Sequence, residues 1–109
     1  MKFNITIAES KHVVHAVDIC QMMEEASEKR GTGIAKRTPE YITQKINEGK
    51  AVVAFYNEQI VGFCYIESWE NHKYIANSGL IVHEDYRKTG LARQIKQMVF
   101  ELSKKKFPN

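Results

Sequence analysis

One stretch, from Leu80 to Phe100, limits more than any other what this chain can fold into. It begins with an apolar run, Leu80-Ile81-Val82, whose composition is typical of a strand. A polar turn follows, and after it apolar residues recur at the spacing of one helix face, namely Leu91, Ile95, Val99 and Leu102. The stretch therefore predicts a strand that leads through a turn into an amphipathic helix.

The turn in this stretch has the properties of an anion-binding site. The first N–H groups of a helix lack intrahelical partners and lie at the positive end of the helix dipole, so they attract phosphate. Gly90 supplies bare backbone where a phosphate would approach, and Ala92 keeps a neighbouring position small. We therefore predict a pyrophosphate site; the alternative is an ordinary strand-to-helix turn in which Arg87 and Lys88 are only solvated.

The residues Arg87 to Ala92 read R-x-x-G-x-A, and the segment Val82 to Tyr86 stands directly before them. Together the two segments resemble the acetyl-CoA motif of the GNAT acetyltransferase superfamily. The resemblance implies acetyl-CoA as co-substrate, with the pantetheine arm and acetyl carbonyl held by backbone groups of Leu80, Ile81 and Val82. It also implies that the pyrophosphate lies against the turn and the first helical amides, at Arg87, Lys88, Thr89, Gly90, Leu91, Ala92 and Arg93.

The composition is that of an ordinary globular protein. A chain of 109 residues fits one domain, spanning residues 1–109, and 43% hydrophobic with 27% charged residues argues against disordered and fibrous classes. No apolar run approaches the ~20 residues of a membrane-spanning helix. The first residues, Met1 to Ser10, lack the apolar core of a secretory signal. We therefore expect a cytoplasmic protein without a membrane partner.

Charge and cysteine content argue against two further classes. The 16 Lys and Arg against 13 Asp and Glu leave a net charge of +3, and no basic face with interleaved aromatic residues indicates a nucleic-acid partner. Cys20 and Cys64 match no metal-binding spacing and do not make a disulfide framework. We expect neither nucleic acid nor a metal cofactor.

The N-terminal half predicts one strand and two helices. Phe3, Ile5 and Ile7 alternate with polar residues, as in a strand with one buried face. Ser10 is the expected N-cap of a helix over residues 11–30, with a buried stripe made of Val13, Val17, Cys20 and Met23. After a loop at Gly31-Thr32-Gly33, the segment Thr38-Pro39-Glu40 begins a second helix that ends at Gly49.

Three antiparallel strands are expected next. They are Ala51 to Tyr56, Ile60 to Trp69 and Tyr74 to Val82, joined by turns at residues 57–59 and around residues 70–72. Gly79 inside the last strand predicts a bulge, because a strand glycine often marks one. In the GNAT fold such a bulge opens the slot for the pantetheine arm.

The predicted fold class is therefore α/β (α+β): a GNAT-like mixed, mainly antiparallel sheet flanked by helices, in the order β-α-α-β-β-β-α. The family continues with further strands and a helix, whereas this chain ends at Asn109, so we expect a C-terminally incomplete domain. An uncovered strand edge invites pairing with another chain. We therefore expect a homodimer in which the strand Tyr74 to Val82 meets its copy.

The general base is not evident from the sequence. Many relatives carry a glutamate on the strand before the motif, but residues 74–82 contain no acidic residue. Glu67, which shares strand parity with Phe63 and Tyr65, is the candidate for a base or an amine-binding group; the alternative is a surface carboxylate. His83 titrates in a useful range but is expected to be structural.

By resemblance the function is an N-acetyltransferase that moves acetyl from acetyl-CoA to a primary amine. Arg30, Lys36 and Arg37 lie where the family shapes its acceptor site and would suit a carboxylate-bearing small molecule, so an amino acid or small metabolite is the expected acceptor. The alternatives are acetylation of a protein amine, a non-catalytic CoA-binding or protein-interaction module, and, for these cations, a solvated loop.

Overall fold

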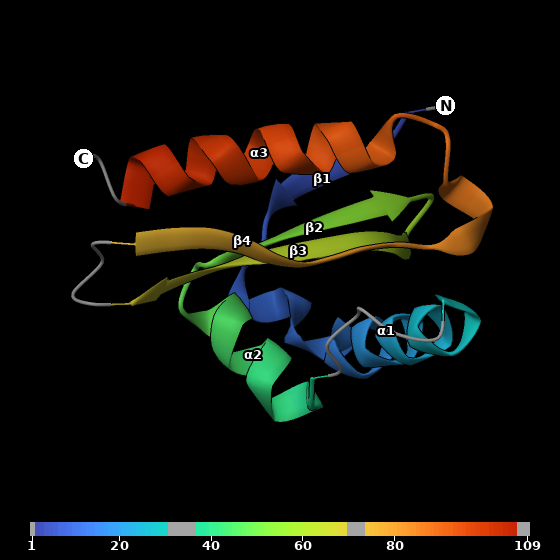
Figure 1. Cartoon of the computed structure of the whole chain (residues 1–109), viewed down its shortest axis with the longest axis horizontal. Coiled ribbons are helices and arrows are strands. Elements are labelled where there is room, and N and C mark those ends of the chain that lie inside the picture. The colour runs from blue at the N-terminus through green and yellow to red at the C-terminus, as the bar shows by residue number, and fades with distance from the viewer. Residues whose placement is uncertain (1, 31–36, 70–73, 107–109) are drawn as a thin grey trace.

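The computed structural model describes residues 2–30, 37–69 and 74–106 (Figure 1). The loop expected at Gly31-Thr32-Gly33 and the turn expected around residues 70–72 lie outside these ranges. In chain order the elements are β1 (Asn4–Ile7), the 3-10 helix η1 (Ser10–His15), α1 (Ala16–Arg30), α2 (Pro39–Asn47), β2 (Ala51–Tyr56), β3 (Gln59–Trp69), β4 (Tyr74–Val82), the 3-10 helix η2 (Glu84–Tyr86) and α3 (Leu91–Lys106). None of the described helices is long and apolar enough to cross a membrane.

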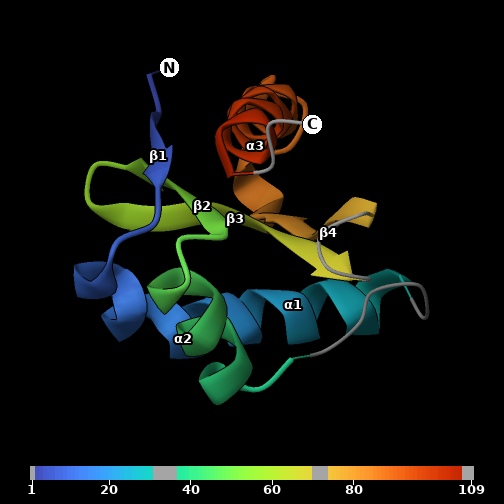
Figure 2. The same cartoon turned by 90° about the vertical axis from the view of Figure 1, so that its left-hand side faces the viewer.

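The strands form one antiparallel sheet in the order β1-β2-β3-β4. Figure 2 shows this sheet as a middle layer, with α3 on one face and α1 and α2 on the other. The predicted α/β fold class and the order β-α-α-β-β-β-α are confirmed, and each pair of neighbouring strands in the described sheet is antiparallel.

The sheet separates two apolar cores. On the α1 and α2 face, buried residues such as Ile19, Met23 and Ile42 pack against Phe63 and Tyr65 of β3. On the α3 face, the predicted helix stripe is confirmed, since α3 buries Leu91, Ile95, Val99 and Leu102 against the strand residues Val52, Val61, Cys64 and Ile66. The two central strands are therefore buried on both faces.

The predicted stripe of the first helix is confirmed except at Val17: Met23 is buried, and Val13 and Cys20 pack partly buried against the same core. Val17 is 63% exposed, whereas Ala16 and Ile19 are buried. Val17 is misplaced because the helix begins as η1: a 3-10 helix turns ~120° per residue against ~100° in an α-helix, so an α-helical spacing counted from Val13 does not hold up to His15. The cap also differs, because Glu9 and not Ser10 precedes the helix, and its N–H donates to His12 Nδ1 at 2.8 Å.

The start of the second helix confirms the prediction. Thr38 is the N-cap of α2, its Oγ1 accepts a hydrogen bond from the Tyr41 N–H at 3.1 Å, and Pro39 occupies the first turn. At the other end, Gly49 has a φ of +71° and donates its N–H to the Ile46 carbonyl at 3.1 Å. Glycine adopts this left-handed conformation without strain, so it ends the helix here.

The β2–β3 turn is tighter than predicted. Asn57 and Glu58 both have positive φ, of 48° and 71°, and Gln59 already pairs with Tyr56. Two successive left-handed residues make a turn whose twist matches that of the flanking strands, so the turn closes over two residues. The turn predicted at residues 57–59 is therefore one residue too long.

The bulge predicted at Gly79 is present. Phe63 pairs with Ile81 and Tyr65 pairs with Ser78, so two steps along β3 correspond to three along β4. The additional β4 residue lies at Gly79 and Leu80, opposite Cys64. The end of β4 that carries Ile81 and Val82 therefore leaves the bulge with its register shifted by one residue relative to the rest of the strand.

A first prediction concerns the contact between α3 and the sheet. A Cβ on Gly62 would lie 2.5 Å from Ile95 Cδ1, so Gly62→Ala overpacks this face and should destabilise the fold by about 1–3 kcal/mol. Ile95→Val removes that Cδ1 and alone should cost about 0.5–1.5 kcal/mol. In urea unfolding the double variant should be more stable than the sum of the single effects, by about 1 kcal/mol.

The matched control is Gly62→Ala combined with Val99→Ala. Val99 is also fully buried in the α3 core, but it is not among the atoms nearest the new Cβ. Its effect should add to that of Gly62→Ala. If the effects of Gly62→Ala and Ile95→Val on stability were also strictly additive, a clash between the new Cβ and Ile95 Cδ1 would be ruled out as the cause.

A second prediction follows from His12, which is 8% exposed. Burial first, and then the nearby Lys11, lower the pKa of His12 below its ordinary value. The unfolded chain then binds more protons than the folded one, so this contribution to stability is present above the ordinary pKa of ~6.5 and is lost as the pH falls through the folded pKa. The urea midpoint should therefore drop between about pH 7 and 5.

His12→Asn tests the assignment, because an amide oxygen can still accept the Glu9 N–H but does not titrate. Its loss of stability on acidification should be smaller than that of the unsubstituted protein. His15→Asn, on the same 3-10 helix, should keep most of the loss, because His15 is only the last of the causes that lower the pKa of His12. Equal pH profiles for the unsubstituted protein and His12→Asn would rule out His12 as the source.

Candidate functional site

The expected pyrophosphate site is the turn between β4 and α3. His83 precedes η2, and its Nδ1 accepts the Asp85 N–H at 3.2 Å, which is the structural role expected for it. The chain then turns through residues 87–90, called here the glycine turn, with φ of +64° at Lys88 and +87° at Gly90. Lys88 occupies the left-handed region that L residues adopt only occasionally, whereas glycine adopts the φ of Gly90 without strain.

Thr89 holds the glycine turn against the helix. Its Oγ1 donates to the Tyr86 carbonyl at 2.5 Å and accepts the Leu91 N–H at 3.3 Å. The first α-helical hydrogen bond runs from the Gln94 N–H to the Gly90 carbonyl at 3.1 Å. The N–H groups of Ala92 and Arg93 precede that bond, and they lie at the positive end of α3.

The glycine turn is open to a ligand. Lys88, Thr89 and Gly90 are exposed, and a Cβ built on Gly90 would meet no atom within 4 Å. Arg87 is half-buried beside them, and Ala92 and Arg93 are exposed on the first turn of α3. Bare backbone, helix N–H groups and cationic side chains therefore converge on one accessible surface, and this combination fits a phosphate group.

The adjoining strand offers a backbone edge. Ile81 and Val82 pair with Phe63 and Gly62 of β3 on one side, and in the described part of the chain no strand pairs with β4 on the other. The Leu80 and Val82 side chains face the α3 core, whereas Ile81 belongs to the opposite core. In the described part of the chain, the backbone N–H and C=O groups on the outer edge of β4, directly before the glycine turn, are therefore not used by another strand.

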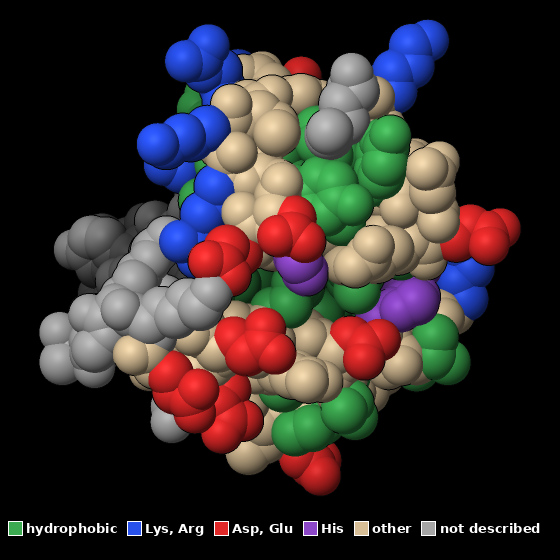
Figure 3. Space-filling model, turned by 90° about the vertical axis from the view of Figure 1, so that its right-hand side faces the viewer, with side chains coloured by type: hydrophobic (Ala, Val, Ile, Leu, Met, Phe, Trp, Pro, Cys, Tyr) green, Lys and Arg blue, Asp and Glu red, His purple; other side chains and the backbone are tan. Residues whose placement is uncertain are grey.

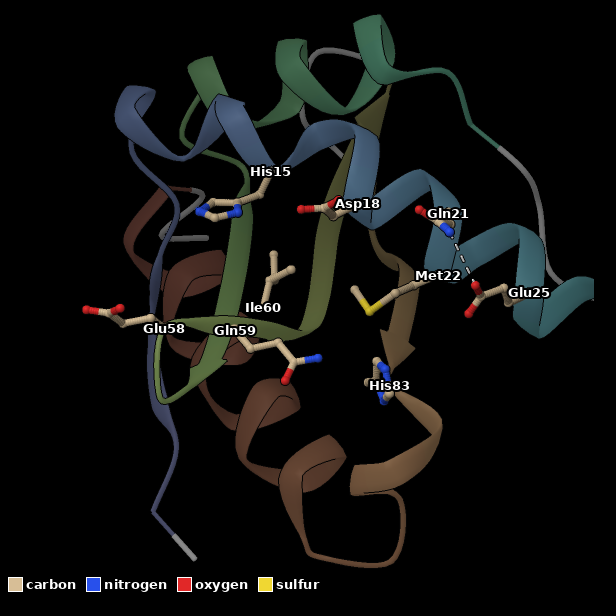
Figure 4. Close-up of a pocket in the computed structure, with 9 residues that line it drawn as sticks. All are labelled: His15, Asp18, Gln21, Met22, Glu25, Glu58, Gln59, Ile60 and His83. Carbon is tan, nitrogen blue, oxygen red and sulfur yellow. Dashed lines mark hydrogen bonds between the residues drawn. The ribbon is translucent and has the colours of Figure 1, made fainter.

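A separate cavity of about 350 Å³ lies at the same end of the sheet (Figure 4). Its walls come from the end of η1, α1, the β2–β3 turn, the start of β3 and the residue after β4, and it is lined by His15, Asp18, Gln21, Met22, Glu25, Glu58, Gln59, Ile60 and His83. In Figure 4, Met22 and Ile60 point into it from opposite sides, and Glu58 points away. Figure 3 shows acidic side chains gathered over this face, which distinguishes it from the cationic glycine turn.

The candidate Glu67 is part of a cluster of side chains under the sheet. The Tyr41 hydroxyl of α2 donates a hydrogen bond to Glu67 Oε1. Arg37, just before α2, donates from Nε to the Tyr65 hydroxyl at 2.9 Å. The predicted parity is confirmed, because Tyr65 and Glu67 both reach these partners from the α1 and α2 face. We call this set, completed by Lys45, the tyrosine cluster.

Aromatic contacts join the members of the tyrosine cluster. The rings of Tyr41 and Tyr65 lie edge to face with centroids 5.6 Å apart. The Arg37 guanidinium lies 5.1 Å from the Tyr41 ring centre, and Lys45 Nζ lies 5.5 and 5.8 Å from the centres of the Tyr41 and Tyr65 rings. Cations at such distances are attracted to the ring faces. The cluster therefore places an anionic group, Glu67, and two cations around two phenols.

The surroundings shift two pKa values in this cluster. Burial, reinforced by the hydrogen bond to Glu67, raises the pKa of Tyr41 far above its ordinary value, so its hydroxyl remains a donor at any working pH. The hydrogen bond from Arg37 to Tyr65 is the main cause that raises the pKa of Arg37. Both groups therefore keep the protonation state in which they donate to their partners.

The sequence singled out only part of this cluster. Glu67 and Arg37 were candidates, but Tyr41, Lys45 and Tyr65 were missed, although the helical spacing of Tyr41 and Lys45 and the strand spacing of Tyr65 and Glu67 each indicate a shared face. The side chain of Arg30 and all of Lys36 lie outside what the structure describes. Within the described ranges, no group of three His, Cys, Asp or Glu side chains is arranged to hold a metal ion.

The fold and the glycine turn agree with a comparison against protein families. The model of the acetyltransferase (GNAT) family matches residues 19–107, which is most of the chain. The chain therefore belongs to the GNAT family. No curated protein matches it.

Solved structures share the fold at low sequence identity. N-acetylglutamate synthase from Neisseria gonorrhoeae, complexed with coenzyme A and N-acetyl-glutamate, is 13% identical with a TM-score of 0.73, over 95% of this chain and 23% of that one. Diaminobutyrate acetyltransferase from Paenibacillus lautus, in complex with L-2,4-diaminobutyric acid and coenzyme A, is 11% identical with a TM-score of 0.74, over 91% of this chain and 57% of that one.

An aminoglycoside acetyltransferase from an uncultured soil metagenomic sample, in complex with sisomicin, is 14% identical with a TM-score of 0.68. That match covers 95% of this chain and 71% of the other. The chain thus spans 23% and 57% of the length of the first two of these neighbours. At such identities the likeness concerns the fold.

Proposed function

We propose that this protein is an N-acetyltransferase that moves acetyl from acetyl-CoA to a primary amine. The observation that carries the proposal is the glycine turn: Gly90 at φ +87°, open on its outer side, at the N-terminus of α3 and directly after β4. Membership of the GNAT family supports it. So do the fold neighbours that are complexed with coenzyme A.

Each part of this site has an assigned task in the proposal. The N–H groups from Lys88 to Arg93 and the side chains of Arg87 and Lys88 hold the pyrophosphate. The outer edge of β4 at Leu80, Ile81 and Val82 holds the pantetheine arm and the acetyl carbonyl by backbone hydrogen bonds. The acetyl group then lies near the bulge at Gly79 and Leu80, on the strand that pairs with Tyr65.

In the reaction, the acceptor nitrogen attacks the thioester carbonyl, the C–N bond forms, the C–S bond breaks and the thiolate takes up a proton. A lysine-like amine has a pKa of ~10.4, so it must first lose a proton. Glu67 is the described residue proposed to bind the amine or assist that loss, directly or through water. An amino acid or another small amine is the proposed acceptor, as for the diaminobutyrate acetyltransferase neighbour.

Measurements of CoA binding and acetyl transfer also distinguish two alternative functions. A non-catalytic CoA-binding or interaction module would bind CoA through the glycine turn but transfer no acetyl group. Acetylation of a protein amine would require an acceptor surface larger than the tyrosine cluster. The proposed domain, residues 1–109, and the cytoplasmic location stay predictions.

A third prediction tests the glycine turn. Gly90→Glu puts a bulky anion where the pyrophosphate approaches and should weaken CoA binding at least about tenfold in calorimetric titration. Gly90→Ala is the matched control, since it imposes the same backbone strain at φ +87° without the charge or the bulk. Its affinity should lie much closer to that of the unsubstituted protein.

Both variants should first be shown to be folded by their circular dichroism. Unchanged CoA affinity in a folded Gly90→Glu protein would remove the assignment of the site. Equal weakening in both variants would instead assign the loss to the backbone conformation and not to a clash with phosphate.

A fourth prediction concerns self-association. We propose that the 109-residue chain forms a two-fold dimer through the outer edge of β4, which in the described ranges lacks a strand partner. Sedimentation at micromolar concentrations should show a mass that rises with concentration toward that of a dimer. The pantetheine arm of CoA and the dimer contact are both proposed to use the outer edge of β4 at Leu80–Val82. Saturating CoA should therefore shift the equilibrium toward the monomer. A monomer at all concentrations would refute the proposal.

A further inference from the structure

In the tyrosine cluster, the cationic Arg37 and the anionic Glu67 bond to different tyrosines and not to each other. Arg37 is bonded to Tyr65, and Glu67 is bonded to Tyr41, while no ion pair joins Arg37 to Glu67 among the described side chains. Adjacent opposite charges on flexible side chains commonly pair and neutralise each other. Here each charge is bonded to a different phenol, and both charged groups contact Tyr41 without pairing with each other.

Each charged group has capacity for a further partner. The Arg37 bond to Tyr65 uses Nε, which leaves the Nη atoms, and these can donate in parallel to a carboxylate. The Tyr41 hydroxyl occupies Oε1 of Glu67, and an ionised carboxylate has acceptor sites on both oxygens. A molecule with both an ammonium and a carboxylate group matches this pair of charges.

The phenols make the arrangement rigid. Tyr65 is 1% exposed, and its ring packs against Phe63 in the core, so its hydroxyl is fixed in position. Tyr41 lies edge to face on Tyr65 and under the guanidinium of Arg37. A ligand group that meets Arg37 and Glu67 would therefore meet preorganised partners, and little side-chain entropy would be lost on binding.

The position of the cluster relative to the cofactor edge agrees with an acceptor site. Tyr65 pairs with Ser78, which precedes the bulge at Gly79, and Glu67 pairs with Ala76. The proposed acetyl position is at that bulge. Tyr65 is therefore on the strand neighbouring the acetyl position, on the sheet face opposite α3.

We propose that Arg37 and Glu67 select an acceptor that carries a free carboxylate beside its primary amine, and that Tyr41 is the positioning residue that holds Glu67 for the ammonium group. This inference rests on the proposed acetyl transfer for its biological meaning. It narrows the proposed acceptor from small amines in general to a small amino acid, and it assigns tasks to Arg37, Tyr41 and Tyr65.

The experiment is a binding measurement on the CoA-bound protein, so it does not depend on turnover. The probes are two matched pairs: glutamate and its α-amide, and 2,4-diaminobutyrate and its α-amide. Calorimetric or NMR titration should show that at least one acid binds roughly ten- to hundredfold more tightly than its amide, the range expected for a charge-assisted hydrogen-bond pair.

The variants separate the roles. Arg37→Gln should bring the acid-to-amide ratio close to unity and leave the affinity for the amide unchanged. Tyr41→Phe keeps the ring contacts with Arg37 and Lys45 but removes the hydroxyl that holds Glu67. It should weaken acid and amide equally, about tenfold, and so should Glu67→Gln.

The double variant of Tyr41 and Glu67 tests whether Tyr41 acts by holding Glu67 in place. Combined with Glu67→Gln, Tyr41→Phe should weaken binding no further, because the carboxylate that it holds is already gone. Tyr56→Phe is the matched control, since it removes a phenol hydroxyl near the other core and should change neither affinity. Additive losses, or an Arg37→Gln protein that still prefers the acids, would overturn the proposal.

Acetyl transfer to the same probes separates this inference from the proposed function. Transfer without preference for the acids would leave the acetyltransferase standing and overturn the carboxylate assignment. Carboxylate-dependent binding without any CoA release would support the binding site and count against the transfer activity. If none of the four probes bound to the unsubstituted protein, the inference would be overturned.

Discussion

The packing of α3 on the sheet determines where the candidate site can form. Leu91, at the first turn of α3, is 1% exposed and anchors the helix beside β4 at its N-terminal end. Gly62 allows close approach, since a Cβ there would collide with Ile95. Because the helix axis is fixed by this core, the N–H groups of its first turn are held at the end of β4, where the glycine turn requires them.

The parts of the structure that depend on local sequence could be predicted. The glycine turn, the α3 stripe and the Thr38 cap are each specified by residues within one or two turns of each other, so backbone preference and spacing suffice. The bulge at Gly79 was also predicted, because a glycine inside a strand often marks a bulge. These features cover the expected cofactor surface and most of the element order.

The errors have physical causes that spacing does not reveal. The 3-10 helix η1 changes the rotation per residue at the start of the first predicted helix, so Val17 is exposed, whereas a periodicity count assumes one helix type throughout. The tyrosine cluster joins Arg37, Tyr41 and Tyr65, and the Arg37 and Tyr65 partners are 28 positions apart in the chain. Such a contact depends on which face of the sheet α2 covers, and therefore on the packed fold.

The two parts of the proposed site, the pyrophosphate surface and the tyrosine cluster, consequently differ in how many side-chain substitutions they tolerate. The pyrophosphate surface is made of backbone N–H groups in one continuous segment and tolerates varied side chains provided that Gly90 keeps its conformation. The tyrosine cluster is made of side chains from β3, α2 and the residue before α2, so a single substitution there alters which charges face a ligand without moving the backbone. A fold built in this way can keep one cofactor while its acceptor changes, because the sheet separates the core that positions α3 from the core that positions Tyr41 and Tyr65.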